Sequence, residues 1–223
     1  MSENSQIAVL TSKSLPDLVC SELERWIISG KVSPGEPLRE AEISAELGLS
    51  RGPVREAFRI LAERGLVRAE KNRGVRVEDL TFEQVQEIYE VRIALEGLIG
   101  RLAAERIEEA GMHILRGTIE EMTAAVEEKD VRRYSRLNFR LHEELAECAQ
   151  NTVLKETYLR LVARLELFRS YSLRHEEGRA ALSCREHRAI VEAVCSKDAL
   201  QAEKLLAAHT KESFARIAAL MNG

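Results

Sequence analysis

One segment in the N-terminal third of the chain restricts its fold more than any other. The segment Leu38–Val77 reads LREAEISAELGLSRGPVREAFRILAERGLVRAEKNRGVRV. Its periodicity predicts a short helix over Glu40–Leu47, closed by a glycine turn at Gly48. A second helix is expected to begin near Arg51, because Ser50 is a good N-cap and a proline follows within the first turn. Two helices at this spacing, joined by a tight turn, form a helix-turn-helix.

The residues after the second helix predict a β-hairpin. Gly65 interrupts the helical periodicity, and the runs Leu66–Ala69 and Gly74–Val77 then alternate apolar and polar side chains as strands do. The turn between them, residues 70–73, is mostly charged. A helix-turn-helix followed by a basic hairpin is a winged helix, an element that usually binds DNA.

The local charge of this segment suits a phosphate-binding surface, although the whole chain is acidic. The formal net charge of the 223 residues is −4. Ser50–Arg76 nevertheless contains eight Lys or Arg and three Glu, a local charge of +5. Because electrostatic binding to phosphates depends on the local field, the acidity of the whole chain does not exclude DNA as a partner.

Beyond Thr81 the sequence carries only helical signals. Apolar stripes at helical spacing, such as Leu137 and Leu141, recur in the later segments. We expect helices at roughly 15–29, 82–109, 111–128, 130–149, 151–174, 177–196 and 198–220, with breaks at Gly111, Asp130, Asn151, Gly178 and Asp198. The expected fold is therefore mainly α: an N-terminal winged helix-turn-helix with a small β-hairpin wing over residues 1–78, and a C-terminal all-α antiparallel bundle of about six helices over residues 79–223.

The rest of the composition predicts a cytoplasmic location. No apolar run approaches the roughly 18 residues that a membrane helix needs. The N-terminus lacks the basic and apolar segments of a secretory signal. Four scattered cysteines, Cys20, Cys148, Cys184 and Cys195, form no CxxC pair. We therefore expect reduced thiols and no association with a membrane.

The second predicted helix carries the side chains that a DNA-reading helix needs. Arg51, Arg55 and Arg59 recur at every fourth residue and spread over only about 80° of the helix surface. Val54 and Phe58 lie on an adjoining face and can pack into a core. Arg can donate two hydrogen bonds to guanine in the major groove, whereas a solvated charged face is the ordinary alternative. The candidate DNA-contacting residues are Arg39, Ser50, Arg51, Gly52, Arg55, Arg59, Lys71, Asn72, Arg73 and Gly74.

These motifs resemble the GntR family of bacterial transcriptional regulators. LREAEISAELGLSRGPVREAFRILAERGLV and NRGVRV match the branch that carries a FadR-like, all-helical effector domain, the FCD domain. In the C-terminal part, EVRIALEGLIGRLAA, NFRLHEELAECAQN, EHRAIVEAV and AAHTKES stand in the order expected of that domain. Six effector-domain helices resemble the shorter, VanR-like subgroup. The resemblance thus covers nearly the whole chain from about residue 15.

Three histidines can converge inside the predicted bundle. His142 lies one turn after Asn138, and His187 and His209 lie beside apolar stripes in the last two helices. Buried imidazoles can ligate Zn²⁺ or a similar divalent ion. A histidine beside an apolar stripe is, however, more often a packed and hydrogen-bonded core residue. Spacing alone leaves both alternatives open.

The resemblance favours the metal. In many FCD domains an Asp and a His one turn apart join two later His to hold a divalent ion, and those His positions match His142, His187 and His209. Asn138 stands where the family usually has Asp. Because a neutral amide oxygen is a poorer ligand than a carboxylate, we expect weaker metal binding. The resemblance implies Zn²⁺ first, with Ni²⁺ or Mn²⁺ as alternatives.

The resemblance also implies a small organic acid as effector. Metal-bearing members of the family bind such acids with a carboxylate facing the ion. Arg92 matches the Arg of the family pattern VRxxLE and is the candidate effector-binding residue, since a guanidinium pairs well with a carboxylate. The alternative is a salt bridge from Arg92 to Glu96, one turn later.

Together these features predict a DNA-binding transcriptional regulator, most simply a repressor, that binds an inverted-repeat operator as a homodimer. An organic acid in the helical domain would modulate operator binding, and the protein would work in the bacterial cytoplasm, at the nucleoid when bound to DNA. Two other classes stay open: a metal-dependent enzyme with an appended DNA-binding domain, and an architectural DNA-binding protein without effector. The sequence has no HExxH motif and no Glu-x-x-His pair of the di-iron type, which counts against an enzyme.

Overall fold

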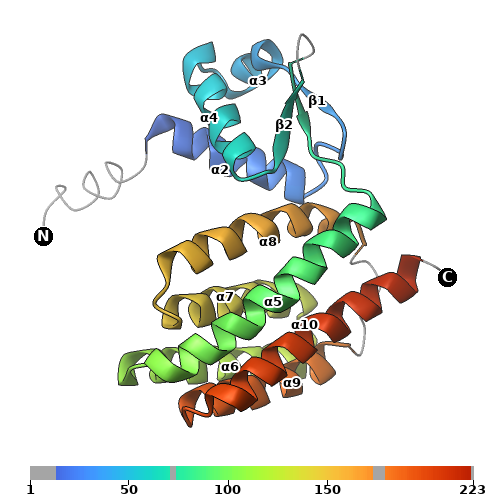
Figure 1. The fold of residues 1–223 in the computed structure, drawn as a ribbon. Coiled ribbons are helices and arrows are strands. Elements are labelled where there is room, and N and C mark those ends of the chain that lie inside the picture. The colour runs from blue at the N-terminus through green and yellow to red at the C-terminus, as the bar shows by residue number, and fades with distance from the viewer. Residues whose placement is uncertain (1–13, 71–73, 173–178, 222–223) are drawn as a thin grey trace, which may run out of the picture. The chain divides into compact units, whose positions relative to one another are not determined.

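The computed structural model describes residues 14–70, 74–172 and 179–221. The chain folds into two compact units, Met1–Leu80 with Ala163–Tyr171, and Thr81–Val162 with Ser172–Gly223 (Figure 1). The described residues are mainly helical and contain one small antiparallel sheet, which confirms the predicted fold class. The domain boundary expected after residue 78 stays a prediction.

The N-terminal unit contains a winged helix-turn-helix. Its elements in chain order are α2 (Leu15–Ile28), β1 (Pro37–Leu38), α3 (Glu40–Leu47), α4 (Arg51–Glu63), β2 (Val67–Glu70) and β3 (Gly74–Val77). The outer strands both pair antiparallel with β3, which gives the order β1-β3-β2. Strand β1 was not predicted, because its two residues are too few to show the alternation of a strand.

The tight turn between α3 and α4 depends on a left-handed glycine. Gly48 has φ 66° and ψ 31°, a conformation that costs an ordinary residue about 1–2 kcal/mol. Ser50 occupies the N-cap position of α4 as predicted, but its hydroxyl makes no capping hydrogen bond. The apolar face of α4 packs into the core of the unit through Val54, Ala57, Phe58 and Leu61. This buried stripe leaves the arginine-bearing face of α4 exposed.

Strands β2 and β3 form the wing. Val67 pairs with Val77 and Glu70 with Gly74. Gly74 has φ 85°, a left-handed conformation that suits glycine. Three candidate DNA-contacting residues of the wing tip lie outside the described residues: Lys71, Asn72 and Arg73.

From Thr81 onward the described chain is helical. Its elements are α5 (Phe82–Arg106), α6 (Glu109–Glu127), α7 (Val131–Cys148), α8 (Thr152–Ser172), α9 (Arg179–Cys195) and α10 (Ala199–Met221). All six helices expected here are present, and the ends that can be compared differ from the predicted ones by a few residues. The predicted break at Gly178 and the helix ends predicted at residues 174 and 177 lie outside the described residues. α5 begins with a capping box in which the side chains of Thr81 and Gln84 each accept a backbone N–H of the other residue. None of the described helices is both long enough and apolar enough to span a membrane.

One predicted helix break is wrong. Gly111 lies inside α6, and the chain turns at Ile107 and Glu108 instead. Ile107 has φ −58° and ψ 134° and is buried, so an apolar side chain rather than a glycine anchors this turn. A Cβ atom on Gly111 would lie 3.1 Å from the Sγ atom of Cys148. The glycine therefore serves close packing of α6 against α7.

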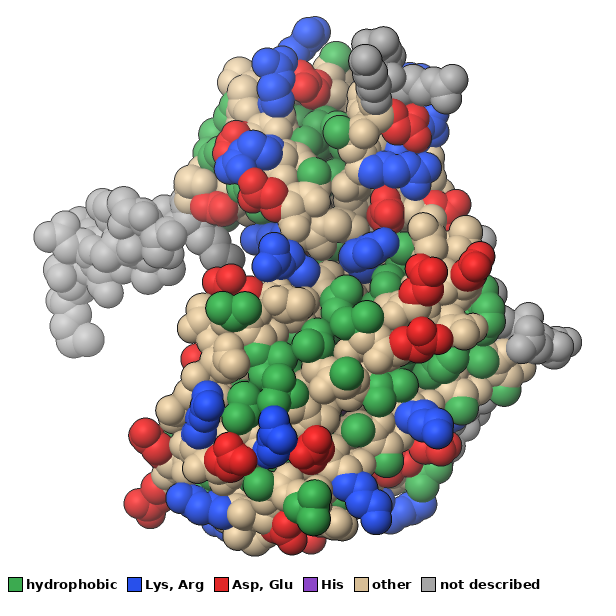
Figure 2. All heavy atoms as spheres, in the orientation of Figure 1, with side chains coloured by type: hydrophobic (Ala, Val, Ile, Leu, Met, Phe, Trp, Pro, Cys, Tyr) green, Lys and Arg blue, Asp and Glu red, His purple; other side chains and the backbone are tan. Residues whose placement is uncertain are grey.

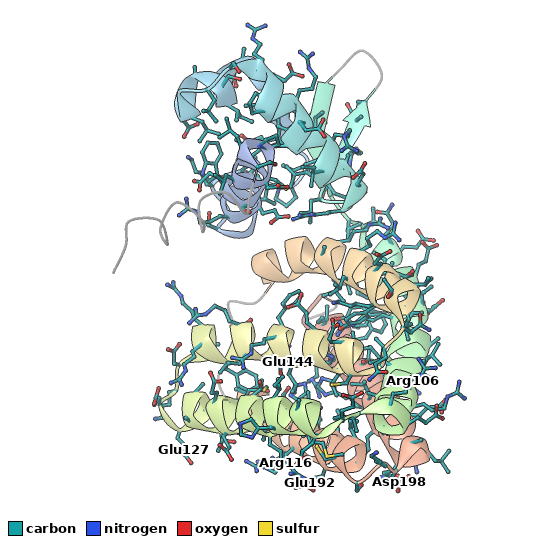
Figure 3. The ribbon with its side chains drawn as sticks, turned by 90° about the vertical axis from the view of Figure 1, so that its left-hand side faces the viewer. Arg106, Arg116, Glu127, Glu144, Glu192 and Asp198 are labelled. Atoms are coloured by element: carbon teal, nitrogen blue, oxygen red, sulfur yellow. The ribbon has the colours of Figure 1, made fainter. Side chains whose placement is uncertain are left out.

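Reciprocal hydrogen bonds join the ends of α5 and α7. Arg106, which is labelled in Figure 3, donates through Nη1 to the carbonyl oxygens of Ala149 and Gln150 at 2.9 and 3.1 Å. The side chain of Gln150 donates back to the Arg106 carbonyl at 3.2 Å. These bonds give partners to carbonyls at the helix ends, which intrahelical bonding leaves unpaired. They also anchor the C-terminal end of the helix that carries His142.

The packing of α5 against α10 gives a stability prediction. A Cβ atom on Gly100 would lie 2.6 Å from the carbonyl oxygen of Ala202, a backbone atom that cannot rotate away. We expect Gly100→Ala to lower the free energy of unfolding by about 1–3 kcal/mol, because the two helices must move apart. Gly97→Ala is the matched control: its Cβ would lie 3.6 Å from its nearest neighbours, an ordinary separation. That variant should gain about 0.5–1 kcal/mol of helix stability. Urea unfolding measures both, and equal effects would contradict the prediction.

Candidate metal centre and DNA-contacting surface

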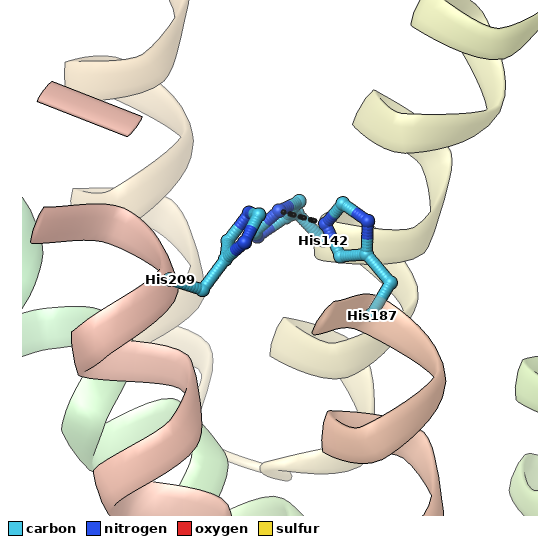
Figure 4. Close-up of side chains that lie close together, drawn as sticks. All are labelled: His142, His187 and His209. Carbon is cyan, nitrogen blue, oxygen red and sulfur yellow. Dashed lines mark hydrogen bonds between the residues drawn. The ribbon is translucent and has the colours of Figure 1, made fainter. Parts of the chain in front are cut away.

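Three buried histidines from three helices meet inside the second unit (Figure 4). His142 comes from α7, His187 from α9 and His209 from α10. One ligand atom from each ring can be chosen so that all three lie within 4.8 Å of one another. The Nε2 atoms of His142 and His187 are 3.2 Å apart. Because Zn–N bonds of about 2.0–2.1 Å in a tetrahedral site hold two nitrogens about 3.3 Å apart, this spacing fits a zinc site.

Hydrogen-bonding groups surround the outer nitrogen of each ring. His142 Nδ1 lies 3.4 Å from Oε1 of Glu96, and His209 Nδ1 lies 2.7 Å from Oε2 of Glu186. His187 Nδ1 lies 3.4 Å from the hydroxyls of two residues, Tyr134 and Ser183. An imidazole that donates from Nδ1 to a carboxylate presents the lone pair of Nε2 to the other side. The pattern is that of metal-ligating histidines held by an outer set of hydrogen bonds.

Burial favours the neutral form of two of the rings, His142 and His187. It is the largest cause that lowers the pKa of His142, although the charge of Glu96 opposes it. The pKa of His187 lies well below its ordinary value, first through burial and then through the neighbouring His209 and His142. Neutral imidazole is the form that binds a metal. Two inward lone pairs only 3.2 Å apart repel each other unless a proton or a cation lies between them, so the cluster is either a hydrogen-bonded core or a metal site.

The lowered pKa values predict a pH dependence for the metal-free protein. Below pH 6.5, the ordinary histidine pKa, His142 and His187 bind protons in the unfolded chain but stay unprotonated in the folded chain until the pH is lower. The free energy of unfolding should therefore fall between about pH 6.5 and 5, by up to about 1.4 kcal/mol per pH unit for each of His142 and His187. Urea unfolding with a chelator present, at several pH values, measures this slope. His187→Gln should flatten the slope, whereas His113→Gln, at an exposed position, should not; equal slopes would contradict the explanation.

Asn138 and Arg92 are placed differently with respect to this cluster. Asn138 lies one turn before His142 on α7 and is half-buried. Arg92 is buried on α5 and forms an ion pair with Glu96, with Nε and Nη2 at 2.8 and 2.7 Å from Oε1. The alternative weighed from the sequence for Arg92 is therefore present, as a buried pair within one helix. Its role toward an effector stays a prediction.

Glu96 is the centre of a buried polar network beside the histidines. Besides its interactions with Arg92 and His142, it accepts hydrogen bonds from the hydroxyl of Tyr158, at 2.9 Å, and from that of Thr210. Burial acts to raise the pKa of Glu96, but the charge of Arg92 and the hydrogen bonds from His142 and Thr210 outweigh it, and the pKa lies well below its usual range. The carboxylate is thus ionised and fully bonded. One carboxylate links the candidate effector-binding arginine to a candidate metal ligand.

The sequence did not predict that Glu186 and Glu96 would be hydrogen-bonding partners of the histidine rings. Glu186 precedes His187 in the chain, yet its carboxylate contacts His209 on another helix, a pairing that no local spacing reveals. Glu96 was considered only as a partner of Arg92. An i, i+4 relation does connect Ser183 to His187, and that spacing could have been found.

The DNA-contacting candidates on α4 differ in how their guanidinium groups are engaged. Arg51 forms no ion pair with any described residue. Arg55 is held by Glu40 of α3, with Nε 2.9 Å from Oε1 and Nη2 2.8 Å from Oε2. Arg59 donates from all three nitrogens to the carboxylates of its own helix, Glu56 and Glu63. The α4 arginines are therefore not equivalent in the free protein.

The remaining candidates of this unit lie around the same elements. Arg39, which precedes α3, pairs with Glu42 at 2.7 Å. An open groove of about 500 Å³ runs between β1, β3 and the start of α3, with Arg39, Glu40 and Arg76 among its lining residues. Gly52 is exposed in the first turn of α4, and a Cβ atom there would meet nothing within 4 Å. In Figure 2, Lys and Arg side chains interspersed with Asp and Glu stand out from the α3 and α4 region.

Two family models match the chain. Residues 17–77 match the family described as bacterial regulatory proteins, gntR family, and residues 87–212 match the FCD domain. The matched ranges contain α4 and the three histidines respectively. The chain is thus a regulator of transcription with a DNA-binding helix-turn-helix.

Named relatives agree with this assignment. The chain is 33% identical over 204 residues to the "Probable D-xylose utilization operon transcriptional repressor" of Paenarthrobacter nicotinovorans, covering 89% of each chain. It is 31% identical over 190 residues to the HTH-type transcriptional repressor RspR of Escherichia coli (strain K12), covering 85% of this chain and 83% of the relative. Among solved structures, E. coli McbR/YncC has a similar fold, with a TM-score of 0.79, 21% identity, and 92% and 97% of the two chains covered. The protein belongs to the GntR family of bacterial transcriptional regulators, in the branch that carries an FCD domain.

Proposed function

We propose that this regulator is a repressor that binds an inverted-repeat operator as a homodimer, in the cytoplasm and at the nucleoid, and that a small organic acid bound in the FCD domain changes its operator affinity. The proposal depends on one observation: the same chain has an exposed arginine face on α4 and a buried cluster of three histidines in the helical unit. The relatives named as repressors support the direction of regulation.

A divalent cation fits the histidine cluster. His142, His187 and His209 would hold it through Nε2, with the half-buried Asn138 as the fourth candidate ligand. Neutral imidazoles suit Zn²⁺ or Ni²⁺ better than Mn²⁺, which favours oxygen ligands. When bound, the cation supplies positive charge that a carboxylate of the effector can approach. Because every protein ligand in this set is neutral, no ligand atom would cancel that charge.

Arg92 would assist through its donors rather than through its charge. Glu96 already neutralises the guanidinium and occupies Nε and Nη2, while Nη1 lies 3.4 Å from the hydroxyl of Tyr89. The N–H groups not directed at Glu96 are the ones left for an effector carboxylate or hydroxyl. The attraction for an acid must therefore come mainly from the cation, and recognition of its shape from Arg92 and the hydroxyl groups around it.

Two measurements test this function. Selection of bound DNA from a random-sequence pool should enrich a two-fold symmetric motif whose half-sites are about one helical turn apart. Operator affinity, measured with the zinc-loaded protein and a panel of small organic acids, should change with at least one acid. Selection that enriches no symmetric motif would contradict the operator, and an affinity that no acid changes would contradict the effector.

A further inference from the structure

One acidic residue of α3 forms a bidentate ion pair with an arginine on the exposed face of α4. Glu40 begins α3, and its two carboxylate oxygens accept one hydrogen bond each from Nε and Nη2 of Arg55, at 2.9 and 2.8 Å. The Arg55 side chain is 70% exposed to solvent, although its Nε and Nη2 are both bonded to Glu40. A bidentate interaction of this kind fixes the plane of the guanidinium as well as its position.

The donors that Glu40 leaves unused are those that a base needs. A guanidinium has five N–H groups. Glu40 occupies the side edge, which consists of Nε and one N–H of Nη2. The end edge, formed by Nη1 and the second N–H of Nη2, bonds to no residue that the structure describes. Two parallel donors on that edge can pair with O6 and N7 of guanine while the pairing with Glu40 persists.

The neighbouring arginine is engaged in a different way. Arg59 directs Nε and Nη2 to Glu56 and Nη1 to Glu63, so carboxylates occupy all three of its nitrogens. Only one N–H is left on each of Nη1 and Nη2, so a base that paired with this arginine would share both nitrogens with a carboxylate. The contrast identifies Arg55 as the arginine of this helix that a carboxylate orients without blocking.

From this geometry we propose that Glu40 is a positioning residue that sets the sequence selectivity of the DNA-reading helix. The inference rests on the proposed function, because it assumes that Arg55 contacts a base. Glu40 acts in two ways. It holds Arg55 in the orientation for guanine, and its negative charge repels phosphates, so DNA that offers Arg55 no guanine binds poorly.

Three variants separate positioning from charge. Glu40→Gln should lower operator affinity about tenfold, because one oriented base contact in each half-site is weakened. The same variant should raise affinity for random DNA a few-fold, because a repulsive charge is lost. Glu40→Asp keeps the charge but is one methylene too short for the fork. It should lower operator affinity and leave affinity for random DNA unchanged.

Glu42→Gln is the matched control. Glu42 lies in the same first turn of α3 and carries the same charge, but it pairs with Arg39 instead of a residue of α4. Its replacement should raise affinity for operator and random DNA alike and leave their ratio unchanged. Fluorescence anisotropy with both DNAs at one salt concentration measures the ratios, and melting temperatures verify that each variant is folded.

The possible outcomes separate this inference from the proposed function. A wild-type ratio in Glu40→Gln or Glu40→Asp, or an equal fall in Glu42→Gln, would overturn the role of Glu40. Arg55→Ala serves as the reference. If that variant keeps the wild-type ratio, Arg55 does not contact a base, and the proposed mode of DNA reading fails together with the inference. If only Arg55→Ala lowers the ratio, the proposed function stands and Glu40 has no part in it.

Discussion

Replacing Arg51 and Arg55 together by alanine should reduce operator affinity to the level of random DNA, a loss of about 10³-fold or more. A good bidentate contact to a base contributes about 1–3 kcal/mol of discrimination. Because the proposed homodimer presents each arginine twice, the double substitution would remove four such interactions. Competition binding against random DNA at a fixed salt concentration measures the loss.

The single substitutions of Arg51 and Arg55 should affect DNA binding in different ways. Arg51 forms no ion pair with a described residue, so Arg51→Ala removes one cation and leaves no carboxylate unpaired. Arg55→Ala leaves the Glu40 carboxylate uncompensated beside the DNA, and the salt dependence of binding should change more in that variant.

Arg64→Ala is the control for charge alone. Arg64 ends α4 and pairs with Glu24 of α2, at the opposite end of the helix from Arg51. Its replacement removes the same charge and should weaken binding to operator and random DNA to the same small extent. Sequence-selective binding that survives in the Arg51→Ala/Arg55→Ala variant would exclude α4 as the reading helix.

The sequence predicts the elements of this fold well because their signals are local. Periodic apolar residues define α4 and the later helices, and Gly48 with Ser50 marks the turn between α3 and α4. The errors arise where the cause is tertiary. Strand β1 exists only through pairing with β3. Gly111 resembles a helix break, but it is a packing residue inside α6, where Cys148 approaches it closely.

The candidate sites were less predictable for the same reason. Helical patterning allowed His142, His187 and His209 to converge inside the bundle, but only the family resemblance favoured a metal site over a packed core. The outer partners Glu96 and Glu186 reach the rings from α5 and α9. Likewise, the helical spacing that aligned the arginines of α4 could not reveal which of them Glu40 would orient. Interactions between helices decide these roles.

Zinc should stabilise the folded protein strongly, and His187→Gln should remove that effect. A ligand specific to the folded state, at a free concentration 1,000 times its dissociation constant, adds about 4 kcal/mol to the free energy of unfolding. His187 supplies the Nε2 atom 3.2 Å from that of His142, so its loss leaves two imidazoles, which hold zinc poorly. Melting temperatures in chelator and in buffered zinc, together with a competing chromophoric chelator, measure the stabilisation and the affinity.

Two further variants test how the site is built. Glu186→Gln removes the charged acceptor 2.7 Å from His209 Nδ1 and should weaken zinc binding about 10–100-fold. His113→Gln, at an exposed position of α6, should bind zinc as the wild type does. Equal zinc affinity in the His187→Gln variant and the wild type would mean that the rings form a hydrogen-bonded core instead of a metal site.

Asn138→Asp is the most specific test of the zinc site, because this substitution should increase the affinity for zinc. A carboxylate one turn before His142 adds a charged oxygen ligand, so zinc should bind more tightly and Mn²⁺ should gain relative to zinc. The same carboxylate, at a half-buried position, should destabilise the metal-free protein, since partial burial of a charge without a bound cation costs free energy. Opposite changes in the two states would identify position 138 as a ligand position. Unchanged metal affinity would place its side chain outside the coordination sphere, and the cation would then be held by imidazoles alone.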